Sequence, residues 1–179
     1  MYAATEDTVH PLDGIPQCEP GAPLPMVAAD EERTLLTFYA RPTDTGDRAE
    51  WDSVPVSNVA DEAVIIVTFA SCCAHLFGPP NDEAFAGHPL YAKGLRPYSA
   101  AEVRTSSWIR SLERMNAVHP SHRPESFRRY RHFVLAFHDT TFECIAESFD
   151  VQLHRGTTLS ALIAGLSKFD PLAWRHGER

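Results

Sequence analysis

The most constraining feature of the chain is the alternating segment 131–150, RHFVLAFHDTTFECIAESFD. Successive residues of a strand point to opposite faces of a sheet, so a two-residue turn at Asp139-Thr140 would gather apolar side chains on one face. That face would hold Phe133, Leu135, Phe137, Phe142, Cys144 and Ala146. A one-residue slip would mix the two faces, so the pattern predicts an antiparallel hairpin in this register, with its apolar face buried. A longer loop over 138–141 would keep the same pairing.

The other face of this hairpin carries groups that are suited to chemistry. In the predicted register His132 lies opposite Glu147, and Glu143 lies diagonal to His138. Imidazole and carboxylate groups act as acid–base pairs or as metal ligands. The alternative interpretation is a partly solvated sheet face with ordinary cross-strand ion pairs.

The rest of the chain supplies further strands and helices. Apolar and β-branched residues predict strands at 33–40, 63–70 and 100–105, the second lying within one apolar run over 63–77. Periodicity, proline placement and capping residues predict helices at 107–118, at 124–130 and after Thr158. The sequence therefore predicts an α+β fold, in which an antiparallel sheet of about four to five strands has helices packed on one face or end.

Domain organisation follows from length and composition. A chain of 179 residues favours one domain. Five prolines fall within residues 1–28, which predicts an irregular proline-rich arm ahead of a single α+β domain over 29–179. Residues 41–61 are polar and predict a loop.

Charge and cysteine usage exclude several classes of protein. The net charge of −8 argues against bulk binding to nucleic acid or to an anionic membrane surface. The longest apolar run is too short to cross a bilayer. The four cysteines show no spacing typical of a disulfide framework or a zinc site, so we expect reduced thiols, no bound metal and a cytoplasmic location.

The segment 74–90, AHLFGPPNDEAFAGHPL, is a candidate binding loop. Its prolines and glycines alternate with the polar residues His75, Asn81, Asp82, Glu83 and His88. A rigid backbone that displays polar groups is typical of a binding loop. In the alternative interpretation Asn81 caps a short helix and the two acids stabilise its first turn, which leaves the histidines unexplained.

A basic cluster stands out in this acidic chain, with six arginines between residues 110 and 131. Arg128 and Arg131 are candidates for holding a phosphate or carboxylate group of a substrate. The alternative is a solvated helical surface whose arginines pair with acids elsewhere.

Three segments resemble a family of uncharacterised bacterial proteins: 74–95, 106–120 and 131–151. The resemblance covers about half of the chain and rests on AHLFGPPNDEAFAGHPL and FHDTTFEC. It implies a single domain and no particular mechanism.

The leading hypothesis is a small-molecule-binding protein, or more specifically an acid–base enzyme that acts on an anionic small substrate. Its site would form where the segment 75–88 meets the polar hairpin face. His138 or His88 would transfer the proton, and Glu143 would orient the imidazole. The alternative is a non-enzymatic interaction protein, such as an immunity or regulatory factor. The sequence leaves cofactors and oligomeric state open.

Overall fold

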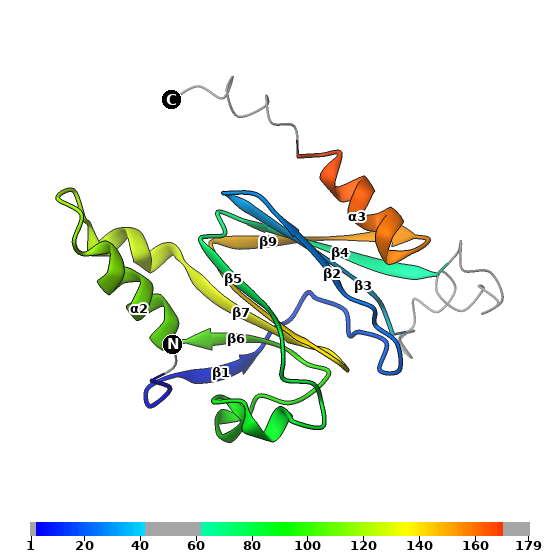
Figure 1. Ribbon diagram of the computed structural model, residues 1–179, viewed down its shortest axis with the longest axis horizontal. Helices are drawn as coiled ribbons and strands as arrows, with labels where there is room; N and C mark the ends of the chain where they lie inside the picture. Colours follow the sequence, from blue (N-terminus) through cyan, green and yellow to red (C-terminus); the bar gives the residue numbers. More distant parts are fainter. Residues whose placement is uncertain (1–2, 42–61, 170–179) are drawn as a thin grey trace.

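The computed structural model describes residues 3–41 and 62–169 of the chain. Its strands form two sheets in which neighbouring strands are antiparallel (Figure 1). The five-stranded sheet contains, in spatial order, β1 (Thr8–Pro11), β6 (Ala100–Arg104), β7 (Arg131–Ala136), β8 (Thr141–Ala146) and β5 (Ala74–Gly78). The four-stranded sheet contains β2 (Met26–Ala29), β3 (Arg33–Tyr39), β4 (Ala63–Ala70) and β9 (Ser148–Arg155). Beyond its first residue, the loop predicted over 41–61 lies outside the described residues.

The fold is thus mostly antiparallel sheet with few helices, and the expectation of one sheet was incomplete. The apolar run 63–77 was predicted as one buried strand, but it is divided between the two sheets. Ser71 adopts a left-handed backbone conformation, with φ at +51°, and the chain crosses there from β4 to β5. Hydrophobicity alone does not reveal this crossing, because apolar residues continue on both sides of it.

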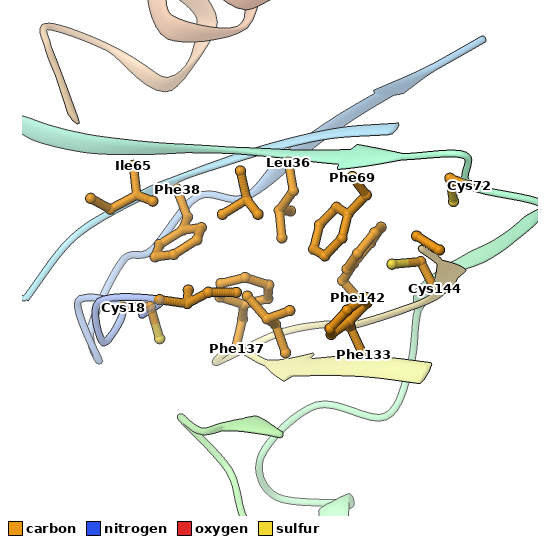
Figure 2. Packing of buried hydrophobic residues seen from close by; sticks show 14 of the residues in the cluster. Cys18, Leu36, Phe38, Ile65, Phe69, Cys72, Phe133, Phe137, Phe142 and Cys144 are labelled. Atoms are coloured by element: carbon orange, nitrogen blue, oxygen red, sulfur yellow. The ribbon is translucent and has the colours of Figure 1, made fainter. Parts of the chain in front are cut away.

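The main core lies between the two sheets (Figure 2). The ring of Phe69 on β4 lies 5.5 Å from that of Phe133 and 5.4 Å from that of Phe142, centroid to centroid. Phe38 and Phe137 make a similar contact at 5.2 Å. All six apolar residues of the predicted hairpin face belong to this core, so the prediction of one buried apolar face is confirmed.

The register of the hairpin differs from the prediction by two residues. Phe133 pairs with Cys144 and Leu135 with Phe142. The turn is centred on His138-Asp139, and the Phe137 N–H donates to the Thr140 carbonyl at 2.8 Å. A shift of two residues leaves every side chain on the same face, so the apolar pattern cannot detect it.

The segment 1–28, expected to be an irregular arm, supplies β1 and the beginning of β2. Each is an edge strand, β1 beside β6 and β2 beside β3. Pro11 ends β1, a position that a proline tolerates because an edge strand has one unpaired side.

Helices lie outside the two sheets. The helix α2 (Ser107–Asn116) and the 3₁₀ helix η4 (Pro124–Arg129) follow β6, close to the expected bounds. The helix α3 (Thr158–Leu166) is capped by Thr157, one residue before the predicted cap, and packs on the outer face of the four-stranded sheet. In the described part of the chain no helix is long and apolar enough to span a membrane.

Gly165 allows α3 to approach the sheet closely. A Cβ atom at this position would lie 3.0 Å from Cδ1 of the fully buried Leu35. Replacing glycine by alanine within a helix normally stabilises it by up to about 1 kcal/mol. Here we expect Gly165→Ala to destabilise the protein instead, by about 1 kcal/mol in urea denaturation, because crowding outweighs helix propensity. The control variant Ala164→Gly measures the effect of helix propensity alone in the same helix. A Gly165→Ala variant that is more stable than wild type would contradict the close packing.

Candidate functional site

The outer face of the five-stranded sheet is covered rather than solvated. The covering loop, residues 81–97, contains the 3₁₀ helices η2 (Phe85–Gly87) and η3 (Tyr91–Lys93). Its residues Phe85, Leu90 and Leu95 pack over Val134 and Ala136. Consequently the polar groups of this face are buried: the exposed fraction is 0% for His132 and 6% for Glu143. The interpretation of this face as a partly solvated surface was therefore wrong.

Glu143 lies at the centre of a buried network with two histidines. Nε2 of His88 lies 3.1 Å from Oε1 of Glu143, and Nε2 of His132 lies 3.0 Å from Oε2. Nδ1 of His132 lies 3.0 Å from the Ser106 hydroxyl, which also caps α2 by accepting from the Ile109 N–H at 3.2 Å. The network therefore joins the covering loop, the hairpin and the start of α2.

The hydrogen bonds determine the tautomer of His88. The backbone N–H of Leu90 points at Nδ1 of His88 at 3.1 Å, and a backbone N–H can only donate. Nδ1 therefore accepts, and the neutral ring carries its proton on Nε2 and donates it to Glu143. A metal ligand needs a free lone pair on the ligating nitrogen, which neither ring atom of His88 offers in this arrangement. Among the described residues, no group of three or more His, Cys, Asp and Glu is arranged to hold a metal ion.

Burial controls the protonation of this network. It raises the pKa of Glu143 to about 7 and lowers the pKa of His132 to about 3. It also lowers the pKa of His88. Both imidazoles are therefore neutral at neutral pH. Because these groups are almost inaccessible, their arrangement suits anchoring of the covering loop better than direct contact with a substrate.

A second cluster, the Asp82–His138–Tyr98 triad, lies partly exposed beside the hairpin turn. Nδ1 of His138 lies 3.0 Å from Oδ2 of Asp82 and 2.9 Å from the Tyr98 hydroxyl. The Tyr98 hydroxyl donates to the same carboxylate oxygen. The backbone helps to place the pair, since the Asp82 N–H donates to the His138 carbonyl at 2.8 Å. The side chain of His138 is 41% exposed, so solvent or a ligand can reach it.

The triad shifts the pKa values of its own members. The hydrogen bond from Tyr98 lowers the pKa of Asp82, and the hydrogen bond to Asp82 raises the pKa of His138. The bond to Asp82 also raises the pKa of Tyr98 to about 12. At neutral pH the triad therefore holds a carboxylate, a protonated phenol and an imidazole that is readily protonated.

A cleft of about 350 Å³ adjoins this triad. Its walls are residues 11–18, the start of β6 with the preceding Tyr98, and the end of β7. The lining is mixed, since Leu12, Ile15, Phe38 and Phe137 form an apolar part and Asp13, Gln17 and Ser99 contribute polar groups. Tyr98 belongs both to the cleft wall and to the triad, so it links the cleft to His138.

The structure brings together only some of the residues that the sequence singled out. His88 contacts Glu143, and His138 contacts Asp82, but the predicted pairing of His138 with Glu143 is absent from the described contacts of the hairpin. The two-residue shift in register explains this, because it places Val134 opposite Glu143 and carries His138 into the turn. His75 pairs with Cys144, so it lies on the opposite face of the sheet from Glu143.

The remaining candidates have local roles or lie elsewhere. Asn81 accepts a hydrogen bond from the Ala84 N–H at 3.0 Å, but it does so in a turn and does not cap a helix over 82–85, because η2 begins only at Phe85 and has no side-chain cap. Glu83 is exposed and its charge contributes to raising the pKa of His138. Arg131 forms an ion pair with Glu102 at 2.7 Å, and Arg128 is exposed on η4. Arg131 is the first residue of β7, and Arg128 precedes it on η4. The start of β7 lies about 20 Å along the strand direction from the turn that holds His138.

Sequence reasoning missed Tyr98, Ser106 and the cleft residues 11–18. Tyr98 directly follows the loop 78–97, but nothing in the local pattern marks it. Residues 11–18 were assigned to the arm because prolines interrupt any periodicity. The sequence pattern predicted that His132 lies opposite Glu147. In the observed register its Nε2 atom lies 3.0 Å from Oε2 of Glu143 instead.

These features define the class of protein: a two-sheet antiparallel fold with a partly exposed Asp–His–Tyr cluster beside a small cleft of mixed polar and apolar lining. Comparisons with family models, with curated proteins and with solved structures find no match.

The triad predicts an unusual titration of His138. In ¹H–¹³C NMR spectra its pKa should lie above its ordinary value of 6.5, and Asp82→Asn should lower it. Because the pKa is raised in the folded protein, the pair contributes stability below pH 6.5 and loses this contribution as the pH rises through the folded value. His132, which belongs to the separate buried network, should titrate identically in both proteins. An unchanged His138 pKa in Asp82→Asn would show that Asp82 does not orient this ring.

Proposed function

We propose that this protein binds a small molecule in the cleft and that His138 acts on it as a general acid–base group. The observation that carries the proposal is the orientation of His138 by Asp82, next to a cleft whose wall includes Tyr98. Since Nδ1 is held by Asp82, Nε2 is the ring nitrogen that remains for proton exchange with a ligand.

Each member of the triad then has a chemical role. Nε2 of His138 takes a proton from the substrate, and the Asp82 carboxylate stabilises the imidazolium that forms. The phenol of Tyr98 keeps its proton at neutral pH, because its pKa is about 12, and donates it to Asp82, which helps to hold the carboxylate beside His138. A raised pKa brings His138 into the range where a base exchanges protons efficiently near neutral pH.

The surroundings favour a neutral or cationic substrate over the anionic one expected from the arginine cluster. Asp82, Glu83 and Asp139 all act electrostatically on His138, and Asp13 lies in the cleft wall. These negatively charged carboxylates around His138 and the cleft oppose the approach of an anionic substrate. The apolar part of the cleft favours a substrate with a compact apolar body.

The buried network supports this site as a positioning device. His88 fastens the covering loop to Glu143 on β8, and the same loop carries Asp82 at its start. Between them η2 is held by a hydrogen bond from the Phe85 N–H to the Asp82 carbonyl at 3.3 Å. The network therefore restrains the backbone that presents the carboxylate to His138.

The alternative, a non-enzymatic interaction protein, is favoured by a different feature. Leu159 and Ile163 on the outer side of α3 are 54% and 60% exposed. Exposed apolar residues on one helix side are typical of interaction surfaces.

Ligand binding tests the proposed function. We expect saturation-transfer NMR with a library of neutral, cationic and anionic fragments to give hits mainly in the first two classes. His138→Gln should weaken these hits at least about tenfold, the loss of roughly 1.4 kcal/mol that one charged hydrogen bond contributes. His119→Gln, at an exposed histidine after α2, is the matched control. Equal binding by wild type and His138→Gln would contradict the proposal.

A further inference from the structure

The strand β5 lies at one edge of the five-stranded sheet and has an unusual composition for that position. In the described part of the chain its one strand neighbour is β8. Its sequence, AHLFG, contains no charged residue and no proline, although the chain carries a net charge of −8. Edge strands normally carry charges, prolines or bulges that prevent pairing with another chain.

Apolar side chains are exposed on both faces of this edge. Leu76 is 43% exposed and shares a face with Glu143, its cross-strand partner. Phe77 is 42% exposed and shares the other face with Phe142. Adjacent exposed residues of this size favour burial against another molecule.

The other sheet edges are less suited to pairing. β1 has four residues and ends in Pro11, and β9 carries Asp150 and Arg155. β2 has four residues and contacts α3. Among the described edges, β5 therefore combines an uncharged strand with large exposed apolar side chains.

We propose that two copies of this chain associate by antiparallel pairing of their β5 strands, which joins the two five-stranded sheets into one. A two-fold axis at Leu76 makes the strand self-complementary, with Leu76 opposite its symmetry mate. On the other face His75 of each copy lies opposite Phe77 of the second copy. The dimer therefore contains two symmetry-related contacts between an imidazole and a phenyl ring. A second copy fits better than a charged peptide, because the edge offers no charge to pair with one.

The contact is small, so the dimer dissociates readily. Five residues per copy bury less than the roughly 1,200 Å² typical of stable complexes. Sedimentation velocity at increasing concentration, up to about 1 mM, should show a reversible monomer–dimer equilibrium of wild-type protein. A wild type that stays monomeric over this range would overturn the proposal.

Charge variants at the two-fold axis test the register. Leu76→Lys and Leu76→Glu each place like charges opposite one another and should raise the dissociation constant at least about tenfold. An equimolar mixture of the two variants should dimerise again, because lysine then faces glutamate, and this rescue also shows that both variants are folded. Leu153→Lys, at a residue with a similar exposed fraction on the edge strand β9, should dimerise like wild type. Undiminished dimerisation of Leu76→Lys, or a mixture that stays monomeric, would contradict pairing through β5.

Discussion

Replacing Phe142 with alanine is expected to lower the free energy of unfolding by about 3–5 kcal/mol. The side chain is fully buried between the sheets, where its ring contacts that of Phe69 at 5.4 Å. Truncation removes this contact and leaves a cavity that neither sheet can close without disturbing its hydrogen bonds. Urea denaturation monitored by circular dichroism measures the loss.

Phe127→Ala is the matched control for this prediction. Phe127 lies on η4 outside both sheets, where it contacts His122 and Tyr130 and is only partly buried. Its truncation should cost less than half as much as that of Phe142. Equal losses at the two positions would mean that the contact between the sheets is not the main source of stability.

Removing the carboxyl group of Glu143 should also have a large effect. Glu143→Ala leaves the buried Nε2 atoms of His88 and His132 without this hydrogen-bond partner, which we expect to cost about 2–4 kcal/mol. The cost should appear as a lower midpoint in urea denaturation. A loss well below 1 kcal/mol would show that the network contributes little to holding the covering loop.

Glu143→Gln separates hydrogen bonding from charge. The amide can accept a hydrogen bond from Nε2 of His88 and can form one with Nε2 of His132, so this variant should be more stable than Glu143→Ala. The pKa of Glu143 rises from 4.5 to about 7 on folding, so the wild type loses stability as the pH increases across this interval. The free energy of unfolding of the glutamine variant lacks this pH-dependent loss. The difference in free energy of unfolding between wild type and Glu143→Gln should therefore shrink between about pH 5 and pH 8. A deficit that grows over this range would contradict the raised pKa.

The sequence predicts the faces of the hairpin better than its details. A period of two along 131–150 is a strong signal, because a slip by one residue would bury Glu143 among phenylalanines. A slip by two residues has no such penalty, and the observed turn at His138-Asp139 depends on backbone geometry that apolar patterns do not encode. The second sheet was missed for a related reason, since the crossing at Ser71 depends on one backbone angle within a continuous apolar run.

The candidate site was predictable only in part. His138 and Asp82 are both chemically conspicuous, and both were singled out, but as members of different constellations. Their contact depends on the hydrogen bond between the Asp82 N–H and the His138 carbonyl, which joins two loops 56 residues apart. Tyr98 and residues 11–18 carry no local signal, because a phenol or a proline-rich segment gains a role only from its neighbours in space.

Chemical-shift mapping of a bound fragment tests the central claim most directly. In ¹H–¹⁵N spectra of wild-type protein, a neutral or cationic fragment from the screen should shift the amide signals of residues 12–18 and 98–100 and of the turn at His138, all of which border the cleft or the triad. The imidazole signals of His138 should shift as well, and its pKa should change when the fragment is bound. Fragments that shift only signals on α3 or β5, with those of the cleft and His138 unchanged, would contradict a small-molecule site beside His138 and favour an interaction protein.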